Sequence, residues 1–228
     1  DGPATRMKLK ARGISPGKFV RYLYRPLDVR WLYWEPDTKL LDEKRSGYFP
    51  HIFEGNIWIE AREKQSKEDF NRGTVTSVLA DNFGSGLSTY FPAYIRETHS
   101  NGENVPIEKR PNLLKSVEDK LTGLGLGVDD LFHHIVSILH SPKYREENAG
   151  ALRMDWPRVP FVENAEVLKV SAVLGHQLAA LMDPEKPVSG VTTSVRAELK
   201  TLGVPSKVAG GDLMANDFAL AAGWGSTQ

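Results

Sequence analysis

The chain has 228 residues, of which 40% are hydrophobic and 25% charged. These fractions are typical of a folded globular protein and disfavour the disordered, collagen-like and coiled-coil classes. Lys+Arg and Asp+Glu each number 29, so the formal net charge is zero. An autonomous DNA-binding domain usually carries a clear positive excess, and the neutral balance therefore argues against tight DNA binding by this chain alone.

Two further absences in the sequence limit the compartment and the chemistry. The chain has no cysteine, which excludes disulfides, thiolate zinc sites and cysteine nucleophiles and fits a reducing compartment. It has no run of 18 apolar residues and no apolar signal core near its start. We therefore expect a soluble protein in the cytoplasm, with no membrane partner.

The N-terminal part has the composition of strands. Residues 17–34 alternate bulky apolar with basic or polar side chains, and Arg25-Pro26 should divide this run into two strands. Short apolar runs at 55–61 and 73–79 predict further strands. Residues 5 to about 95 are thus expected to form a meander of short strands.

In the second half of the chain the apolar spacing becomes helical. It predicts helices over 112–124, 128–140 and 165–182. The run GLGLG at 123–127 lacks the Lys-Ser/Thr of a phosphate-binding loop and follows a helix, so we interpret it as a helix-ending loop. The predicted buried stripe of the third helix consists of Leu168, Ala172, Leu174, Leu178 and Leu181.

Together these patterns predict an α+β fold with a β-rich N-terminal half, a helical part and an irregular C-terminal tail. We assign residues 1–100 to the strand-rich part of one domain and 111–184 to its helical part. Residues 185–228 form the tail, where short strand-like pieces alternate with glycines. The tail has no stop signal, so we expect it to be truncated and packed on the domain.

No group of residues in the sequence has the pattern of a catalytic or metal site. His133 and His134 are adjacent and would point about 100° apart on a helix, which is unsuitable for one metal ion. Pro36-Asp37 with Glu60 loosely resembles a nuclease pattern, but Arg62 stands where lysine is expected. The motifs of an adenine methyltransferase and of a serine hydrolase are absent. A stand-alone nuclease remains a distant alternative.

Positive charge is concentrated near the start of the chain. Between Thr5 and Arg30 there are eight Lys or Arg and one acidic residue, Asp28. The predicted strands carry Arg21, Arg25 and Arg30, interleaved with Tyr22, Tyr24 and Tyr33. Arginine can bond phosphates and the guanine edge, so these side chains are candidates for DNA contact. The alternative is an ordinary solvated strand face.

A second basic group lies in the helical part. It consists of Lys143, Tyr144 and Arg145, with Arg153 and Arg158 shortly after. By itself such a group is ordinary protein surface.

Several blocks of the sequence resemble one family in the same order. The two most specific are Leu139-His140-Ser141-Pro142-Lys143-Tyr144-Arg145 and Asp155-Trp156-Pro157-Arg158-Val159-Pro160. Tyr24–Tyr33, Tyr90–Ile95 and Asp217–Gly225 match further blocks. The chain thus resembles the C-terminal target-recognition, or specificity, region of Type ISP restriction–modification enzymes. Leu27 and Trp156 stand where the family usually has phenylalanine, and Asn148 stands where it often has tyrosine.

The resemblance implies a function in phage defence. The parent enzyme would bind a short asymmetric DNA site, methylate adenine with S-adenosylmethionine, and otherwise translocate with ATP and cleave with magnesium. This region would choose the sequence and perform no chemistry, so it would need no cofactor of its own. Its partners would be double-stranded DNA and the methyltransferase and helicase domains of the parent chain. The alternative is a protein–protein docking module of the same enzyme.

Within this interpretation we assign candidate DNA contacts. Lys143 and Arg145 are candidates for phosphate contact. The candidates for base readout are the less family-like residues Lys64, Gln65, Lys67, Arg72, Asn82 and Ser85. The alternative for these six is a solvated loop. For Arg25, Arg30, Arg145 and Arg158 the alternative is a scaffold role, in which Asp28 would pair with Arg30 and Asp155 with Arg158.

Overall fold

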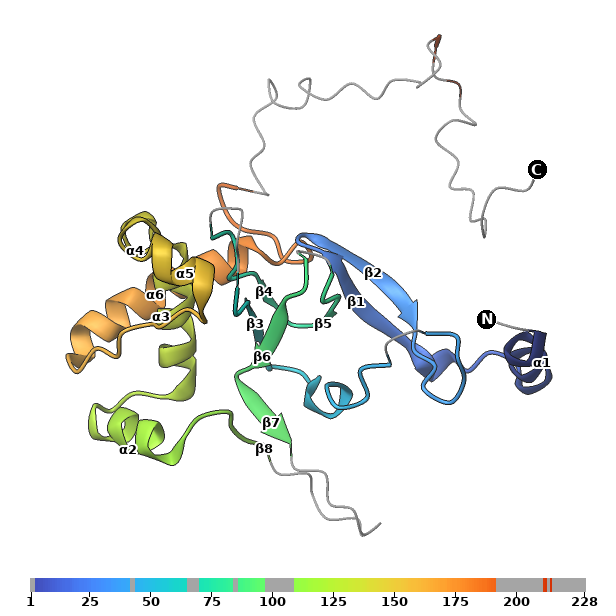
Figure 1. The fold of residues 1–228 in the computed structure, drawn as a ribbon, viewed down its shortest axis with the longest axis horizontal. Helices are drawn as coiled ribbons and strands as arrows, with labels where there is room; N and C mark the ends of the chain where they lie inside the picture. The colour runs from blue at the N-terminus through green and yellow to red at the C-terminus, as the bar shows by residue number, and fades with distance from the viewer. Residues whose placement is uncertain are drawn as a thin grey trace. The chain divides into compact units, whose positions relative to one another are not determined.

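The computed structural model describes residues 3–41, 44–64, 70–83, 86–96, 109–191, 211–212 and 214. The chain divides into two compact units, residues 1–186 and 187–228. Strands occupy the first half of the chain and most helices follow them, which confirms the α+β class (Figure 1). The interval between the two predicted parts, 101–110, lies mostly outside the described residues, and the predicted packing of the tail stays a prediction.

The described strands are short and form three sheets. Their order is β2-β1-β5 in the first, β4-β3-β6 in the second and β7-β8 in the third. The strand bounds are β1 Phe19–Arg25, β2 Asp28–Tyr33, β3 Trp58–Ala61, β4 Val75–Thr76, β5 Leu79–Ala80, β6 Thr89–Pro92, β7 Tyr94–Arg96 and β8 Lys109–Pro111.

The described helices follow mainly after β8. Their bounds are α1 Pro3–Arg12, α2 Lys115–Gly123, α3 Val128–His140, α4 Pro142–Glu147, α5 Ala149–Met154 and α6 Ala165–Leu181. Two single 3-10 turns occupy Pro16–Lys18 and Phe49–His51. The interval between α2 and α3 confirms that GLGLG is a helix-ending loop. None of the described helices is long and apolar enough to cross a bilayer.

The predicted pair of strands in 17–34 is confirmed as the hairpin β1–β2. The chain reverses at Pro26, which has no N–H to donate to a sheet, and at Leu27, which has a positive φ of 66°. The expected meander starting at residue 5 is wrong in two respects. Residues 3–12 form α1, because Ala, Met, Leu, Lys and Arg favour helix. Moreover, β5 pairs with β1 in parallel, so the chain crosses over rather than meanders.

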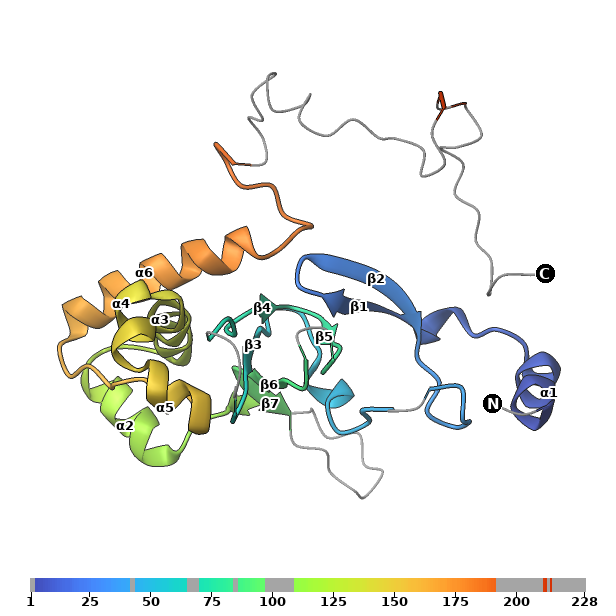
Figure 2. The same ribbon diagram turned by 45° about the horizontal axis from the view of Figure 1, so that its top comes forward.

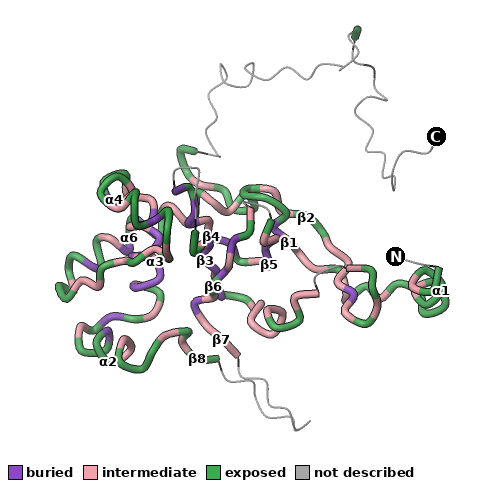
Figure 3. The backbone as a smooth tube through the Cα atoms, viewed as in Figure 1, coloured by how far each residue is buried: buried purple, intermediate pink, exposed green. Residues whose placement is uncertain are grey.

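Helices α2 to α6 gather on one side of the strands β3 to β6 (Figures 1 and 2). A core cluster joins the two groups, with Ile59 and Val75 from strands packing with Phe132, Val136 and Leu139 of α3. The buried residues accordingly concentrate in β3–β6 and α3 (Figure 3). The strand-rich and helical parts of residues 1–186 therefore share one core.

Helices α3 and α6 pack with their backbones in close contact. A Cβ atom built on Gly175 would lie 1.7 Å from the backbone oxygen of His133, so only glycine fits there. His134 is buried, and its Nδ1 and Nε2 atoms lie 2.8 Å from Ser171 Oγ and 3.2 Å from Pro160 O. His134 is thus a core residue.

The buried face of α6 agrees with the predicted stripe in part. Leu168 and Ala172 are buried and Leu178 packs against the core, as predicted, but Leu174 and Leu181 are 51% and 46% exposed and Gly175 is buried. The close approach at Gly175 turns the Leu168 face toward α3. Sequence spacing cannot detect this rotation, because both faces of α6 carry aliphatic residues.

We expect Gly175→Ala to destabilise the domain by about 1–3 kcal/mol or more, because the added methyl group would force α6 away from α3. The matched control is Gly150→Ala in α5, where nothing lies within 4 Å of the added Cβ. Removing a helical glycine should stabilise the protein by up to about 1 kcal/mol. Urea unfolding followed by circular dichroism measures both, and equal stability of the two variants would contradict the packing described.

Candidate nucleic-acid interface

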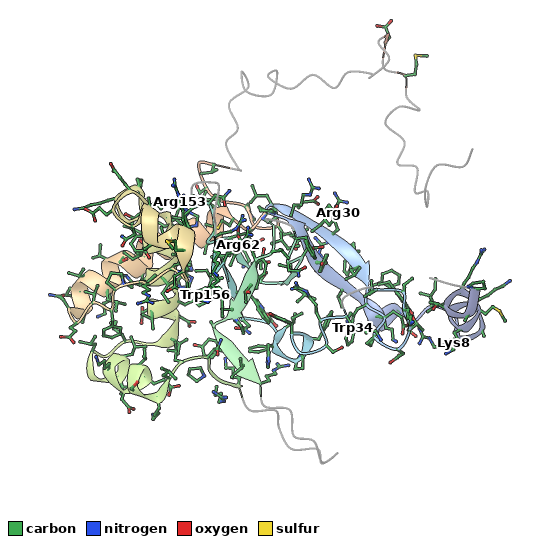
Figure 4. The ribbon with its side chains drawn as sticks, in the orientation of Figure 1. Lys8, Arg30, Trp34, Arg62, Arg153 and Trp156 are labelled. Atoms are coloured by element: carbon green, nitrogen blue, oxygen red, sulfur yellow. The ribbon has the colours of Figure 1, made fainter. Side chains whose placement is uncertain are left out.

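The hairpin β1–β2 presents a group of arginines next to aromatic rings, which we call the hairpin cluster: Arg21, Arg25 and Arg30. The guanidinium carbon of Arg30 lies 4.4 Å from the centroid of the Tyr24 ring, and that of Arg25 lies 5.3 Å from the same centroid. Arg21 lies over Trp31, with its guanidinium carbon 4.9 Å from the ring centroid. Arg30 is on the outer strand of the hairpin (Figure 4).

Two of these arginines also have a carboxylate partner. Arg30 Nη2 lies 2.6 Å from Asp28 Oδ2, and this bond lowers the pKa of Asp28. Arg21 pairs with Glu185. The Arg30 side chain is still 59% exposed, and an exposed ion pair of this kind contributes little free energy. A phosphate can therefore replace or join Asp28 as the partner of Arg30 at a small cost in free energy.

A second group of charges lies where the strands meet the segment after α5. Arg158 Nη2 lies 2.8 Å from Asp155 Oδ2, and the side chain of Arg158 is 87% exposed. The pKa of Asp155 is lowered by the backbone N–H of Trp156, then by Arg158, with a smaller contribution from the charge of Lys64. Lys64 of the strand-rich part thus lies within electrostatic range of Asp155 of the helical part.

An aromatic contact fixes this junction. The Trp156 ring meets the Phe91 ring of β6 edge-on, with 5.6 Å between centroids. Figure 4 places Trp156 between the strands and helices α4 and α5. The segment carrying Arg158 is therefore held against the sheet β4-β3-β6.

Two of the predicted helical contacts are part of the scaffold. Tyr144 is 9% exposed, and its hydroxyl donates to the backbone oxygen of Arg158 over 3.1 Å. Arg145 Nε donates to the Leu139 oxygen over 2.6 Å, and burial lowers the pKa of Arg145. Lys143, by contrast, is 81% exposed and is paired only loosely, with its Nζ atom 3.8 Å from Glu147 Oε1.

Arg72 is also buried. Its side chain is 5% exposed, its Nη2 atom donates to Gly86 O over 3.3 Å, and its Nε atom lies 3.8 Å from Glu60 Oε1. The Glu60 side chain has no exposed surface and accepts a 2.6 Å hydrogen bond from Ser88 Oγ. The positive charge of Arg72 therefore balances the buried carboxylate of Glu60.

Of the remaining candidates, one lines a hollow and three lie outside the described residues. Asn82 lines a hollow together with Arg30 of the hairpin cluster. Gln65, Lys67 and Ser85 lie outside the described residues. Sequence reasoning overlooked two exposed aromatic side chains at the same hollow, Trp31 at 66% and Phe83 at 63%. The strand alternation gave no signal for Trp31, because it shares a strand face with the partly buried Val29.

The part of the chain that the structure describes contains no group of three His, Asp or Glu side chains arranged to hold a metal ion. His133 and His176 have ring centroids 5.0 Å apart, but the Nδ1 atom of His133 lies 2.7 Å from the backbone oxygen of Asp129.

Comparison with known proteins identifies the family. The family model described as Type ISP C-terminal specificity domain matches residues 3–202. The chain belongs to the Type ISP C-terminal specificity domain family. The resemblance found in the sequence motifs is thereby confirmed. No curated protein matches the chain.

Solved structures share the fold of the specificity domain. A cryo-electron microscopy structure of a DrdV–DNA complex is 24% identical, with a TM-score of 0.60, and the alignment covers 80% of this chain and 18% of that one. The Type ISP restriction–modification enzyme LlaGI, as a nuclease-deletion mutant with a DNA substrate mimic, is 22% identical, with a TM-score of 0.56 and coverage of 77% and 15%. The ATP-dependent Type ISP restriction–modification enzyme LlaBIII bound to DNA is 20% identical, with a TM-score of 0.57 and coverage of 82% and 12%. The specificity domain thus spans less than a fifth of the length of each.

Arg72 and Lys64 were both predicted to contact bases, but Arg72 is buried and Lys64 is exposed. We expect Arg72→Ala to destabilise the specificity domain by about 3–5 kcal/mol, because it leaves buried Glu60 without its cation. Lys64→Ala, at an exposed position, should change stability by no more than about 0.5 kcal/mol. Chemical denaturation of both variants tests this, and equal losses would refute the scaffold role of Arg72.

Proposed function

We propose that this specificity domain recognises the target sequence in duplex DNA for a larger Type ISP restriction–modification enzyme and performs no chemistry itself. The observation that carries the proposal is the family match over residues 3–202. Further support comes from the three solved structures of similar fold, whose titles describe DNA complexes or a DNA substrate mimic. The exposed Arg25 and Arg30 of the hairpin cluster and the exposed Lys143 and Arg158 supply suitable donors.

The neutral net charge fits this proposal if the domain forms only one wall of a DNA cleft. Arg30 and Arg158 are exposed, and each is held by a carboxylate of low pKa a few residues away in the chain. Such pairs orient a guanidinium while leaving it accessible to a phosphate. Local rather than overall positive charge then guides the DNA.

Roles within the domain follow from exposure. Lys143 and Arg158 contact phosphates, while Lys64, Arg25 and Asn82 are placed where base edges can be reached from the strands. Arg72, Tyr144 and Arg145 hold the scaffold and are left out of the proposed contacts. Adenine methylation, ATP-driven translocation and cleavage, with S-adenosylmethionine, ATP and magnesium, belong in this proposal to the rest of the parent chain.

We expect the double substitution of Lys143 and Arg158 by alanine in the full-length chain to weaken binding to all duplexes alike. Losing two phosphate contacts should make the slope of log K against log salt concentration shallower by about 1.8. Fluorescence anisotropy on duplexes of randomised sequence, at several salt concentrations, measures this slope. Sequencing the bound fraction in the same experiment shows whether one asymmetric site is enriched.

The matched control is Lys115→Ala in α2. Lys115 is 79% exposed and forms ion pairs within its own helix, like Lys143, but it lies outside the proposed contacts. It should leave the slope unchanged. An unaltered slope in the double variant would refute the phosphate assignment, and wild-type protein that enriches no sequence would refute target recognition.

We also propose docking to the rest of the parent chain as a second function, because α6 has an exposed apolar face. Val167, Val170, Leu174 and Leu181 follow helical spacing on the side opposite α3 and are 46–64% exposed. Aliphatic patches of this kind mark interaction sites. The matched solved chains are more than five times longer than the region aligned here, so the preceding domains of the parent are the proposed occupant.

We expect Val170→Asp with Leu174→Asp to abolish binding of the domain to the rest of the parent chain when the two are produced as separate polypeptides. The fold should remain, because both side chains face away from the core. Calorimetric titration measures the association. The control is Leu114→Asp before α2, where the side chain is 75% exposed. Association that survives the double change would rule out this face as the docking site.

A further inference from the structure

A hollow of about 400 Å³ lies on one face of the sheet β2-β1-β5. The strand register places Arg30 of β2 opposite Tyr22 of β1, and Tyr22 opposite Leu79 of β5. Residues paired across a sheet point to the same face, so these three side chains form one row along the floor. The floor is therefore built on rigid, hydrogen-bonded strands.

The walls of the hollow are aromatic. The Trp34 ring stacks on the Phe49 ring with centroids 3.8 Å apart, and Trp34 Nε1 donates to the Lys44 oxygen over 2.8 Å. These contacts fix the indole of Trp34. Phe83, which also lines the hollow, is 63% exposed, whereas the ring of Trp31 lies on the opposite strand face, beneath Arg21.

The charge of the lining is positive. Arg30, Lys44 and Arg45 line the hollow, with Asp81 the one carboxylate among the lining residues that the structure describes. Arg45 is held by a 3.1 Å hydrogen bond from its Nη1 atom to the Ala80 oxygen. Asp81 Oδ1 accepts from the backbone N–H of Phe83 over 2.7 Å. The lining of the hollow thus combines cations with aromatic rings, and its carboxylate, that of Asp81, already accepts a hydrogen bond.

Aromatic faces combined with cations are the features that bind nucleotides in single strands, because every base has a π-face and every nucleotide a phosphate. The size is within the range of small-molecule sites. The positive lining disfavours a basic peptide, and the cations disfavour an aliphatic segment, which would leave them desolvated. A planar anionic ligand satisfies both parts of the lining.

We propose that this hollow binds an unpaired nucleotide of the DNA, with its base stacked on Phe83 and its phosphate facing Arg30 and Arg45. Asn82 lies at the rim of the same hollow and can reach a base edge. This inference rests on the proposed function, because it takes DNA to be the molecule bound. It adds to duplex recognition a separate site for a base outside the duplex.

The test compares two probes with the full-length chain at low salt. One is a blunt duplex, and the other is the same duplex carrying a short single-stranded thymidine tail. We expect the tail to tighten binding about tenfold, the effect of stacking roughly one base. Phe83→Ala should remove most of this advantage and change the affinity for the blunt duplex less than about twofold. Trp31→Ala, which removes an exposed ring from the opposite strand face, should retain the advantage.

Two variants separate stacking from loss of structure. Phe83→Tyr keeps an aromatic face and should retain most of the advantage of the tail. Phe19→Ala removes a 45% exposed ring at the start of β1, outside the hollow, and should retain all of it. Crosslinking from 5-iododeoxyuridine in the tail should label the peptide that contains Phe83.

The outcomes distinguish this inference from the proposed function. Binding of the blunt duplex without any advantage from the tail overturns the nucleotide site and leaves duplex recognition intact. An advantage that survives Phe83→Ala places the unpaired nucleotide elsewhere and also overturns the site. Failure to bind either probe at low salt overturns the proposed function and the nucleotide site together.

Discussion

The buried carboxylate of Glu60 determines how the strand-rich part is organised. A carboxylate without exposed surface costs several kcal/mol unless charge and hydrogen bonds compensate it. Ser88 and Arg72 supply the compensation, and the backbone N–H of Thr74 lies 3.4 Å from Glu60 Oε2. The segments on both sides of β3 therefore interact with one carboxylate, that of Glu60. Gly73, the residue before Thr74, forms a hydrogen bond through its carbonyl oxygen with His140 of α3. This bond links the surroundings of Glu60 to the helices.

Local sequence patterns predicted the elements well where one periodicity dominates. Residues 128–140 form α3 as predicted, and the break at Arg25-Pro26 coincides with the turn of the hairpin. The errors concern information that periodicity does not carry. Helix α1 was missed because a short basic segment has no apolar face to reveal it. The exposure of Leu174 and Leu181 in α6 was not predicted, because a glycine decides which of two aliphatic faces turns inward.

The candidate interface was only partly predictable. Charge and family motifs identified Lys143 and Arg158, which are exposed, but they also identified Arg72 and Arg145, which are mostly enclosed. Residue type cannot separate a cation that meets solvent from one that balances an internal carboxylate or carbonyl group. The hollow beside Arg30 was not foreseen, because it forms from four separate stretches of the chain between residues 22 and 83.

The contact at Gly175 has a mechanical consequence. Since the backbones of α3 and α6 touch without an intervening side chain, neither helix can turn or slide without the other. His140 at the end of α3 bonds the loop before β4, so this pair of helices is also fastened to the sheet beside Lys64. A displacement of α6 is therefore transmitted through α3 to the strands that carry the proposed DNA contacts. It is not absorbed within the helices.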